Sequence, residues 1–545
     1  MSNVRAIVGR ASTGLHGAAI ILAVATLISQ LLGLLRDRLL AGTFGAGETL
    51  DIYYAAFRVP DFLFIAIGSL LAMTVLVPLL VELLQENNNE KTQRFLSSLF
   101  TVFTIVLLLA SLIAFFCMPV LGKLIAPGFS PTQQLTLVHL SRILLLSPFF
   151  LGLSNLFGSI TQAKRQFLLY SISPILYNLG IISGVVLFYP IFGVSGLVYG
   201  VVLGALLHLL VQLIGSLGSP SPIQERVGGE VGVKFLSFRR IDWPTVHLVL
   251  RRSIPRALAM GANQLSLIVL IAYASHLVSG SIAIFNLSYN LQSVPMALIG
   301  VSYSVAAFPT MVRQLGKSKN EFIEYINSVF RHVLFFSIPI AVLFVVLREE
   351  IVRTILGAGK FGADALHLAA FALAFFAIAV VFQNVVLLFD RSYYAAGKTF
   401  VPVVTNIIGA LVTIAAGYFF VWVSPLTSSP DRLVLGLPLA FALGVTANMI
   451  TEWLWYRRDY GALFDRKLRR TIAESLLASL AMGVVSHMVL RLIAVHAVTT
   501  TSLQALGHGL FAGLSGLVVA TLVLLILGSE ELKTFQAIIH RRLKP

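Results

Sequence analysis

Long apolar runs alternate with short polar segments along almost the whole chain. A helix of about 20 mostly apolar residues is long enough to cross roughly 30 Å of hydrocarbon. The pattern therefore predicts an all-α, polytopic membrane protein with 14 transmembrane helices. Their expected ranges are 16–41, 49–84, 94–122, 134–161, 168–190, 194–217, 246–274, 280–311, 325–347, 364–390, 400–424, 434–456, 472–494 and 506–528.

Composition excludes several other classes of protein. Of the 545 residues, 57% are hydrophobic and 11% are charged, against about 25% charged in a soluble domain. The mean hydropathy of +0.91 agrees with a membrane protein and argues against a soluble enzyme. A single cysteine, Cys117, cannot form an internal disulfide or a cysteine-based metal cluster.

The net charge of +16 informs orientation, because the basic residues lie between the apolar segments. Alternate connections between the expected helices hold 25 Lys and Arg residues on one side and 5 on the other. Cytoplasmic segments of membrane proteins are enriched in Lys and Arg. Both termini are therefore predicted to be cytoplasmic, and no nucleic-acid partner is expected.

Similar residues recur at offsets of about 230 positions, which indicates an internal duplication of six helices. Copies with an even number of helices point the same way through the membrane, so the sequence predicts two six-helix lobes in a parallel repeat, with a cavity between them. Helices 13 and 14 lie outside the repeat. The matching pairs are Pro174 and Pro402, Asn178 and Asn406, Pro78 and Pro309, Gly68 and Gly300, and Gln30 and Gln264.

The repeat and the basic segments define the expected organisation of the chain. The predicted parts are an N-terminal lobe at 1–217, a cytoplasmic linker at 218–245, a C-terminal lobe at 246–456, a basic linker at 457–471, and the last two helices with a cytoplasmic tail at 472–545.

Charged residues inside membrane helices are costly unless they face protein or water, so they are the first candidates for function. In the second expected helix, Asp51, Tyr54, Arg58 and Asp61 would share an arc of about 80° at helical periodicity. Pro60 is expected to bend or loosen that helix.

Polar stripes fall on the first two expected helices of each half, which the repeat places around the central cavity. Pairing between neighbours, or contact with the membrane interface, is the alternative for residues near helix ends. The candidate substrate-binding residues are Gln30, Arg36, Asp37, Asp51, Arg58, Arg252, Arg256 and Asn290.

Motifs of soluble enzymes are incomplete in this chain. Two Gly-Lys-Ser/Thr triplets lack the earlier glycine of a phosphate loop, and the histidines show no metal-ligand spacing. The sequence therefore predicts no enzyme activity, no cofactor and no metal site.

The first two expected helices also carry a family signature. Ser29-Gln-Leu-Leu-Gly33-Leu-Leu-Arg36-Asp37, Phe44-Gly-Ala-Gly47, Asp51 and Ala56-Phe-Arg58-Val-Pro60 resemble the MurJ (MviN) family of lipid II flippases. The resemblance extends over all expected helices. It implies the fold of the multidrug/oligosaccharidyl-lipid/polysaccharide exporter superfamily, in which two six-helix lobes alternate in access and two further helices form a groove for the lipid tail.

The resemblance also shows where the chain departs from the family. Family members usually have arginines at the positions of Gln30, Phe64 and Asn290, and an acidic residue at Ser69. The resemblance implies that such arginines line the cavity and meet a diphosphate. The family residues that carry over are Arg36, Asp37, Asp51 and Arg58, while Arg252 and Arg256 are candidate substitutes by helical phase.

Together these features favour a flippase of the bacterial cytoplasmic (inner) membrane. Its expected substrate is a polyprenyl-diphosphate-linked glycan, above all lipid II, moved from the inner to the outer leaflet. Membrane lipids and cell-wall synthesis enzymes are the other expected partners. The alternatives are an exporter of another lipid-linked oligosaccharide or of drugs, and a non-transporting scaffold for cell-wall enzymes.

Overall fold

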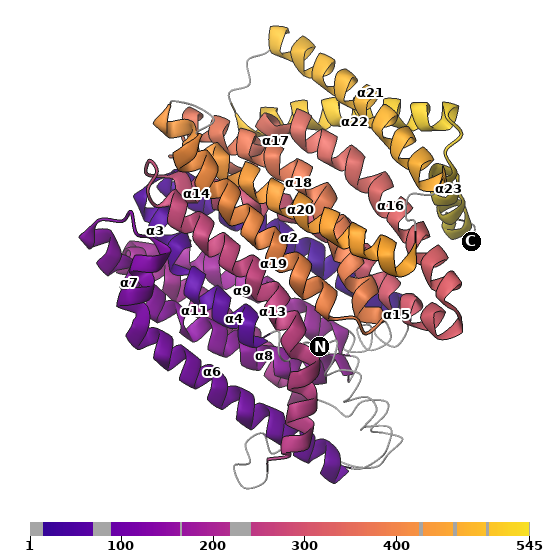
Figure 1. Ribbon diagram of the computed structural model, residues 1–545. Helices are drawn as coiled ribbons and strands as arrows, with labels where there is room; N and C mark the ends of the chain where they lie inside the picture. Colours follow the sequence, from indigo (N-terminus) through magenta and orange to yellow (C-terminus); the bar gives the residue numbers. More distant parts are fainter. Residues whose placement is uncertain are drawn as a thin grey trace, which may run out of the picture. The chain divides into compact units, whose positions relative to one another are not determined.

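The computed structural model describes residues 15–68, 89–163, 166–217, 241–424, 429–461, 466–496 and 501–543. Throughout these ranges the regular elements are helices, which Figure 1 shows as coiled ribbons. The all-α class expected from the apolar pattern is confirmed.

Twelve helical segments in the described ranges are long and apolar enough to cross a membrane. Each coincides with one of the expected helices from the third to the fourteenth. They are Gln93–Ile125, Pro131–Gln162, Phe167–Phe192, Val194–Ser216, Ser253–Ala274, Ser281–Lys317, Lys319–Val346, Ala363–Ala395, Phe400–Val423, Pro430–Tyr460, Arg466–Val495 and Ser502–Ile526.

The two remaining expected helices explain why the count of 14 is not confirmed. The first coincides with α2 (Leu15–Phe44), a helix of 30 residues whose side chains are described only from Ile21 onward. The second begins as α3 (Glu48–Ala56) and α4 (Arg58–Gly68), and its continuation at 69–84 lies outside the described residues.

The chain divides into two compact units. Unit 1 contains the described residues up to Leu40 together with Ile52–Ala272. Its further elements are α6 (Asn89–Ile125), α7 (Pro131–Leu144), α8 (Leu146–Ala163), α9 (Phe167–Ser183), η2 (Gly184–Phe188), α10 (Tyr189–Phe192), α11 (Val194–Leu217) and most of α13 (Trp243–Ala274). The repeat assigns α13 to the second lobe, yet its Val246 and Val249 pack in the apolar core of unit 1 beside Phe100 of α6.

Unit 2 contains Ala41–Asp51 and the chain from Tyr273 onward. Its elements are α14 (Ser281–Met296), η3 (Ala297–Val301), α15 (Ser302–Lys317), α16 (Lys319–Val346), α17 (Arg348–Leu356), α18 (Ala363–Ala395), α19 (Phe400–Tyr418), η4 (Phe419–Val423), η5 (Pro430–Leu435), α20 (Gly436–Tyr460), α21 (Arg466–His496), α22 (Ser502–Ile526) and α23 (Glu530–Leu543).

The predicted repeat is visible in matching local contacts. In α9, Asn178 Nδ2 donates to the carbonyl oxygen of Pro174 at 3.2 Å, and in α19, Asn406 Nδ2 donates to that of Pro402 at 2.8 Å. Each of these helices also runs into a π-helical turn, η2 after α9 and η4 after α19. These parallels between the units support the duplication.

Glycines bring one helix pair of each unit into backbone contact. A Cβ added at Gly180 of α9 would lie 2.3 Å from Cα of Gly204 on α11. In unit 2, a Cβ at Gly444 of α20 would lie 2.6 Å from the carbonyl oxygen of Gly409 on α19. Small residues allow membrane helices to approach this closely and to gain van der Waals contact where the hydrophobic effect is absent.

The second expected helix is interrupted at Phe57, between α3 and α4. Pro60 explains the position, since it has no N–H to donate to the carbonyl group four residues earlier. That group belongs to Ala56 and accepts instead from Ser141 Oγ on α7 at 3.2 Å. The loosening expected at Pro60 is confirmed, and the single arc predicted for Asp51 through Asp61 stays a prediction.

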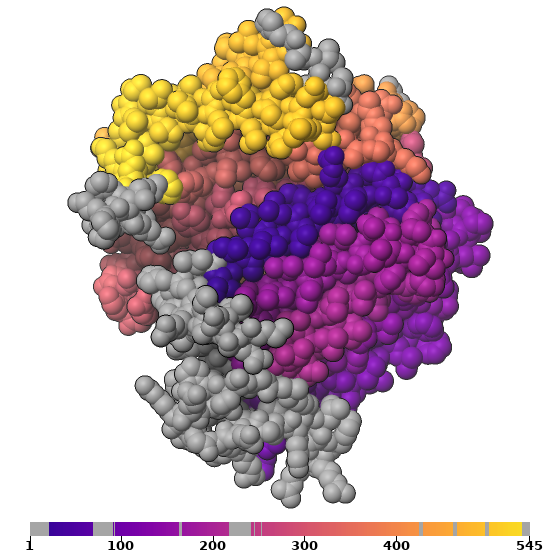
Figure 2. Space-filling model, turned by 180° about the vertical axis from the view of Figure 1, so that it is seen from behind, coloured from indigo at the N-terminus to yellow at the C-terminus, as the bar shows by residue number. Residues whose placement is uncertain are grey.

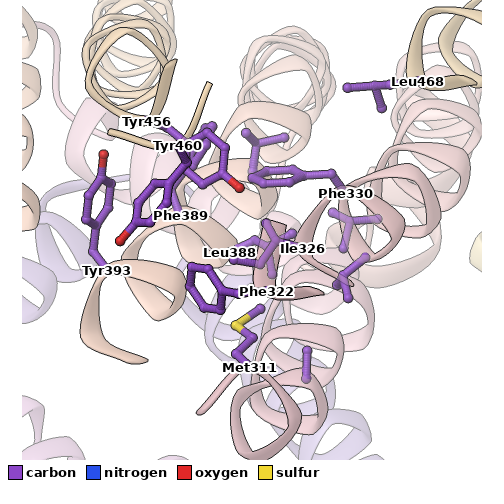
Figure 3. Close-up of a cluster of buried hydrophobic side chains, with 14 of the residues drawn as sticks. Met311, Phe322, Ile326, Phe330, Leu388, Phe389, Tyr393, Tyr456, Tyr460 and Leu468 are labelled. Atoms are coloured by element: carbon purple, nitrogen blue, oxygen red, sulfur yellow. The ribbon is translucent and has the colours of Figure 1, made fainter. Parts of the chain in front are cut away.

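Aromatic and aliphatic side chains fill the core of unit 2. The close-up in Figure 3 shows Phe330, Phe389, Tyr393 and Tyr456 among them, and all four are buried. The C-terminal helices pack onto the same unit, α21 on α16 and α22 on α17. Figure 2 shows their yellow surface lying over salmon-coloured residues of this unit.

Candidate functional site

An ion pair lies inside unit 1 near the end of α2. Arg36 Nε and a second guanidinium nitrogen both lie 2.9 Å from Asp37 Oδ1. The Asp37 side chain is 2% exposed and the Arg36 side chain 22%. Arg36 also donates to Asn178 Oδ1 on α9 at 3.4 Å. The carboxylate and the amide thus hold the guanidinium in one orientation, while part of the Arg36 side chain stays accessible.

Arg58 lies at the start of α4, where the interruption at Phe57 places it. The residue is buried, and its Nε donates to the backbone oxygen of Tyr54 at 3.3 Å. Asp61, one turn further along α4, interacts electrostatically with Arg58. The short helix therefore holds a second arginine in unit 1.

Tyr54 lies between the two arginines. Its ring carries a hydroxyl within electrostatic reach of Asp37, Arg36 and Arg58. This hydroxyl is buried and has no hydrogen-bond partner among the residues that the structure describes. Two arginines and an O–H donor are groups that bind phosphate oxygens. The cluster of Arg36, Asp37, Tyr54 and Arg58 is called the basic cluster below.

Asp51 occupies a different environment, in unit 2. Its two carboxylate oxygens accept from the backbone N–H groups of Gly280 at 2.6 Å and Ala283 at 2.8 Å. These groups belong to the N-terminal turn of α14, where unpaired N–H groups and the helix dipole favour an anion. These contacts make Asp51 a cap for α14, and its predicted role in substrate binding stays a prediction.

The other predicted residues are distributed over both units. Gln30, partly exposed on α2, lines a cavity of unit 1, and Arg256 lies partly exposed on α13. Asn290 is partly exposed on α14 of unit 2. The side chain of Arg252 lies outside the part of the chain that is described. Substrate binding by these residues stays a prediction.

Two members of the site were not among the predicted residues. Asn178 was visible only as half of a repeated Pro-Asn motif, and its contact with Arg36 joins residues 142 positions apart. Tyr54 lay on the predicted polar face of the second helix, but an aromatic residue at such a position is more often part of a core. Burial beside two arginines is the signal that singles it out.

Arginines held within the apolar helices of unit 1 are typical of a multi-pass membrane transporter. Comparison with known families makes the assignment specific. A family model described as Lipid II flippase MurJ matches residues 40–527. The chain belongs to this family of flippases and is a multi-pass protein of the bacterial inner membrane.

Curated relatives agree over most of the chain. A probable lipid II flippase MurJ of Rhizobium tropici is 27% identical over 471 residues, which cover 84% of this chain and 84% of the relative. The lipid II flippase MurJ of Burkholderia cenocepacia is 26% identical over 438 residues, with 79% and 82% covered.

Solved structures show the same fold. The lipid II flippase MurJ in an inward closed conformation superposes with a TM-score of 0.72 at 22% identity, covering 94% of this chain and all of the other. An inward-facing MATE family transporter of the MOP superfamily gives 0.61 at 16% identity, with 82% and 98% covered. The fold expected from the sequence signature is thus confirmed.

Proposed function

We propose that the protein moves lipid II, a polyprenyl-diphosphate-linked glycan, from the inner to the outer leaflet of the bacterial inner membrane by alternating access. The relatives that carry this activity in their names match the chain over about four fifths of its length. They do not favour the other functions considered from the sequence, drug export or a scaffold for cell-wall enzymes.

The basic cluster is the observation that carries the proposal. A diphosphate and its sugars cannot cross hydrocarbon unaided, because their charges and hydroxyl groups would lose their hydrogen bonds. Arg36 is oriented by Asp37 and Asn178, and 22% of its side chain stays exposed, so a ligand can approach it. Arg58 and the hydroxyl of Tyr54 supply further donors nearby.

In this mechanism the protein replaces water around the diphosphate. Arginine binds phosphate oxygens through two parallel N–H donors, and its charge offsets that of the ligand. Asp37 limits the net positive charge, so the ligand is not held too tightly to leave. A transporter requires this balance, because a ligand that strongly favours one conformation arrests the cycle.

The lipid tail has an apolar surface available in unit 2. A cavity of about 430 Å³ lies between α16, α18, α20 and α21. Phe330, Ile338, Trp453 and Ile472 are among the side chains that line it. Because α21 belongs to the two helices outside the repeat, this cavity supports the tail-binding role that the family resemblance implies for them.

Orientation and partners complete the proposal. The excess of Lys and Arg on one side of the expected helices favours cytoplasmic termini. Transport of this kind needs no covalent chemistry, so we expect no catalytic residue. Enzymes that synthesise lipid II on the inner face and polymerise it outside are the natural partners.

Loss of Arg58 tests the proposed function. We expect that Arg58→Ala abolishes complementation of a strain depleted of its lipid II flippase, while Arg58→Lys keeps part of it. Arg142→Ala is the matched control, since Arg142 is an arginine of the same unit that donates to the carbonyl oxygen of Phe115 outside the basic cluster. Normal growth on Arg58→Ala at normal protein levels would remove Arg58 from the mechanism.

A direct assay tests the substrate. Protein reconstituted in vesicles with labelled lipid II should move it between leaflets. Failure of the wild-type protein to do so, when a functional relative succeeds in the same vesicles, would overturn the proposal.

A further inference from the structure

Unit 1 contains a polar cavity beside the basic cluster. It has a volume of about 340 Å³ and lies between α2, α8, α9 and α11. Ligand sites of this size accommodate small organic groups. The side chains that bear on its chemistry are Ser29, Gln30, Asn155, Tyr170, His208 and Gln212.

Gln212, one of the residues that line this cavity, carries a buried acceptor that lacks a partner among the described residues. Gln212 is 1% exposed, and its Nε2 donates to Ser173 Oγ at 2.6 Å and to the backbone oxygen of Tyr170 at 3.2 Å. Its Oε1 accepts no hydrogen bond from any residue that the structure describes. Leaving a buried acceptor unsatisfied is costly, so an occupant with an O–H or N–H donor is expected.

The lining of the cavity is uncharged. Among the described residues, Lys, Arg, Asp and Glu are absent from its walls, and the polar group that α2 places there is the amide of Gln30. The ring nitrogen Nδ1 of His208 is within 2.6 Å of Ser154 Oγ, so a neutral hydroxyl satisfies it. A diphosphate would find no cation here, whereas a neutral group rich in hydroxyls and amides would find donors and acceptors.

Asn178 links the cavity to Arg36. Its Oδ1 accepts from the guanidinium at 3.4 Å, and its Nδ2 donates to Ser29 Oγ, on the cavity wall, at 3.2 Å. Ser29 precedes Arg36 by seven residues, which is about two helical turns and about 10.5 Å along a helix. The charged and the neutral region are therefore adjacent on one face of α2.

We infer that this cavity binds the uncharged N-acetylated sugar that is attached to the diphosphate held at Arg36. The inference rests on the proposed function and adds a second subsite to it. The hydroxyl and amide groups of such a sugar supply the donor that Gln212 Oε1 lacks. The uncharged amide of Gln30 keeps this subsite neutral, so the diphosphate is expected at Arg36 instead.

Two lipids that differ only in the sugar test the inference. Binding of undecaprenyl diphosphate, and of the same lipid bearing an N-acetylated disaccharide, is measured to the full chain in lipid nanodiscs by native mass spectrometry. We expect the wild-type protein to bind the sugar-bearing lipid more tightly. Gln212→Leu and Asn155→Leu should weaken that binding about tenfold and leave the bare diphosphate unaffected, since each removes a polar wall group.

Control variants separate binding from folding. Gln212→Leu removes two hydrogen bonds of the fold and could therefore unfold the protein. Asn155 makes no side-chain hydrogen bond among the described contacts, so Asn155→Leu tests the cavity without that loss. Gln162→Leu makes the same kind of change on α8 outside the cavity lining and should leave binding of both lipids unchanged.

The possible failures are distinguishable. If the wild-type protein binds neither lipid, the proposed function itself falls. If it binds both and the cavity variants weaken neither, or weaken both equally, the cavity holds water only and the inference falls alone.

Discussion

An ion pair with the almost fully buried carboxylate of Asp37 stabilises the charge of Arg36 inside unit 1. The 2.9 Å contact with Asp37 offsets the cost of burying two charges, and Asn178 fixes the direction of the guanidinium. Breaking a buried pair by removing one partner typically costs about 3–5 kcal/mol, because the other charge is left unpaired. A single substitution at Arg36 therefore confounds lost binding with lost stability.

A paired substitution separates the two effects. We expect Arg36→Ala to lower the free energy of unfolding by about 3–5 kcal/mol, and the double variant Arg36→Ala/Asp37→Asn to recover most of it because no lone charge is buried. Transport should remain lost in both, since neither has the guanidinium. Unfolding in detergent and lipid II translocation in vesicles measure the two effects. Wild-type transport by the double variant would contradict a role for Arg36 in binding.

The sequence identified residues of the candidate site but not the residues that they contact. Charge inside apolar helices singled out Arg36, Asp37 and Arg58, and the structure brings these three together around Tyr54. The partner of Arg36 on α9 could not be predicted, because helical periodicity carries no information on which helices meet.

At the scale of elements, α14 begins with a cap from a distant part of the chain. Its N-cap residue is Gly280, with a φ of 95° that favours glycine and with no side chain to accept from the first turn. Asp51 supplies both acceptors from α3, 229 positions earlier than Gly280. The sequence predicted the helix and its polar residues. The cap could not be predicted, because helix-capping motifs are recognised only within a few residues of the helix start.

Removal of this cap should loosen the start of α14. Asp51→Ala is expected to destabilise the protein by about 1–2 kcal/mol, the usual cost of losing an N-terminal cap. Hydrogen exchange at the amides of Gly280 and Ala283 should accelerate at the same time. Glu48→Ala, an exposed carboxylate on α3, is the control and should change neither quantity. Unchanged exchange in Asp51→Ala would show that the cap contributes nothing.

The close contact between α9 and α11 in unit 1 depends on Gly180. Gly180→Ala places a methyl group 2.3 Å from a backbone atom of α11, so the helices must separate. We expect a loss of about 1–3 kcal/mol, as in other overpacked cores. Gly261→Ala on α13 has open space around it and should be neutral or stabilising. Equal melting temperatures for the two variants would refute the close contact.

For the whole molecule, the apolar pattern sufficed to predict twelve membrane helices, from the third to the fourteenth, with small shifts at their ends. It also predicted α2, in which Arg36, Asp37 and Arg38 follow the apolar run, and it was less informative for the second helix, which Pro60 interrupts. These first two helices carry Arg36, Asp37 and Arg58 of the basic cluster. Orientation in the membrane depends on a separate signal, the uneven distribution of Lys and Arg.

That distribution predicts which loops face the cytoplasm. In a Cys117→Ser background, which removes the one native thiol, single cysteines are placed at Lys317 and at Lys360, both exposed. Lys317 follows the eighth expected helix, on the side with 25 basic residues, and Lys360 follows the ninth, on the side with 5. A membrane-impermeant thiol reagent added to intact cells should label the cysteine at 360 and spare that at 317, because basic loops are retained inside. Labelling of 317 alone would invert the topology, and with it the direction in which the basic cluster is first presented to lipid II.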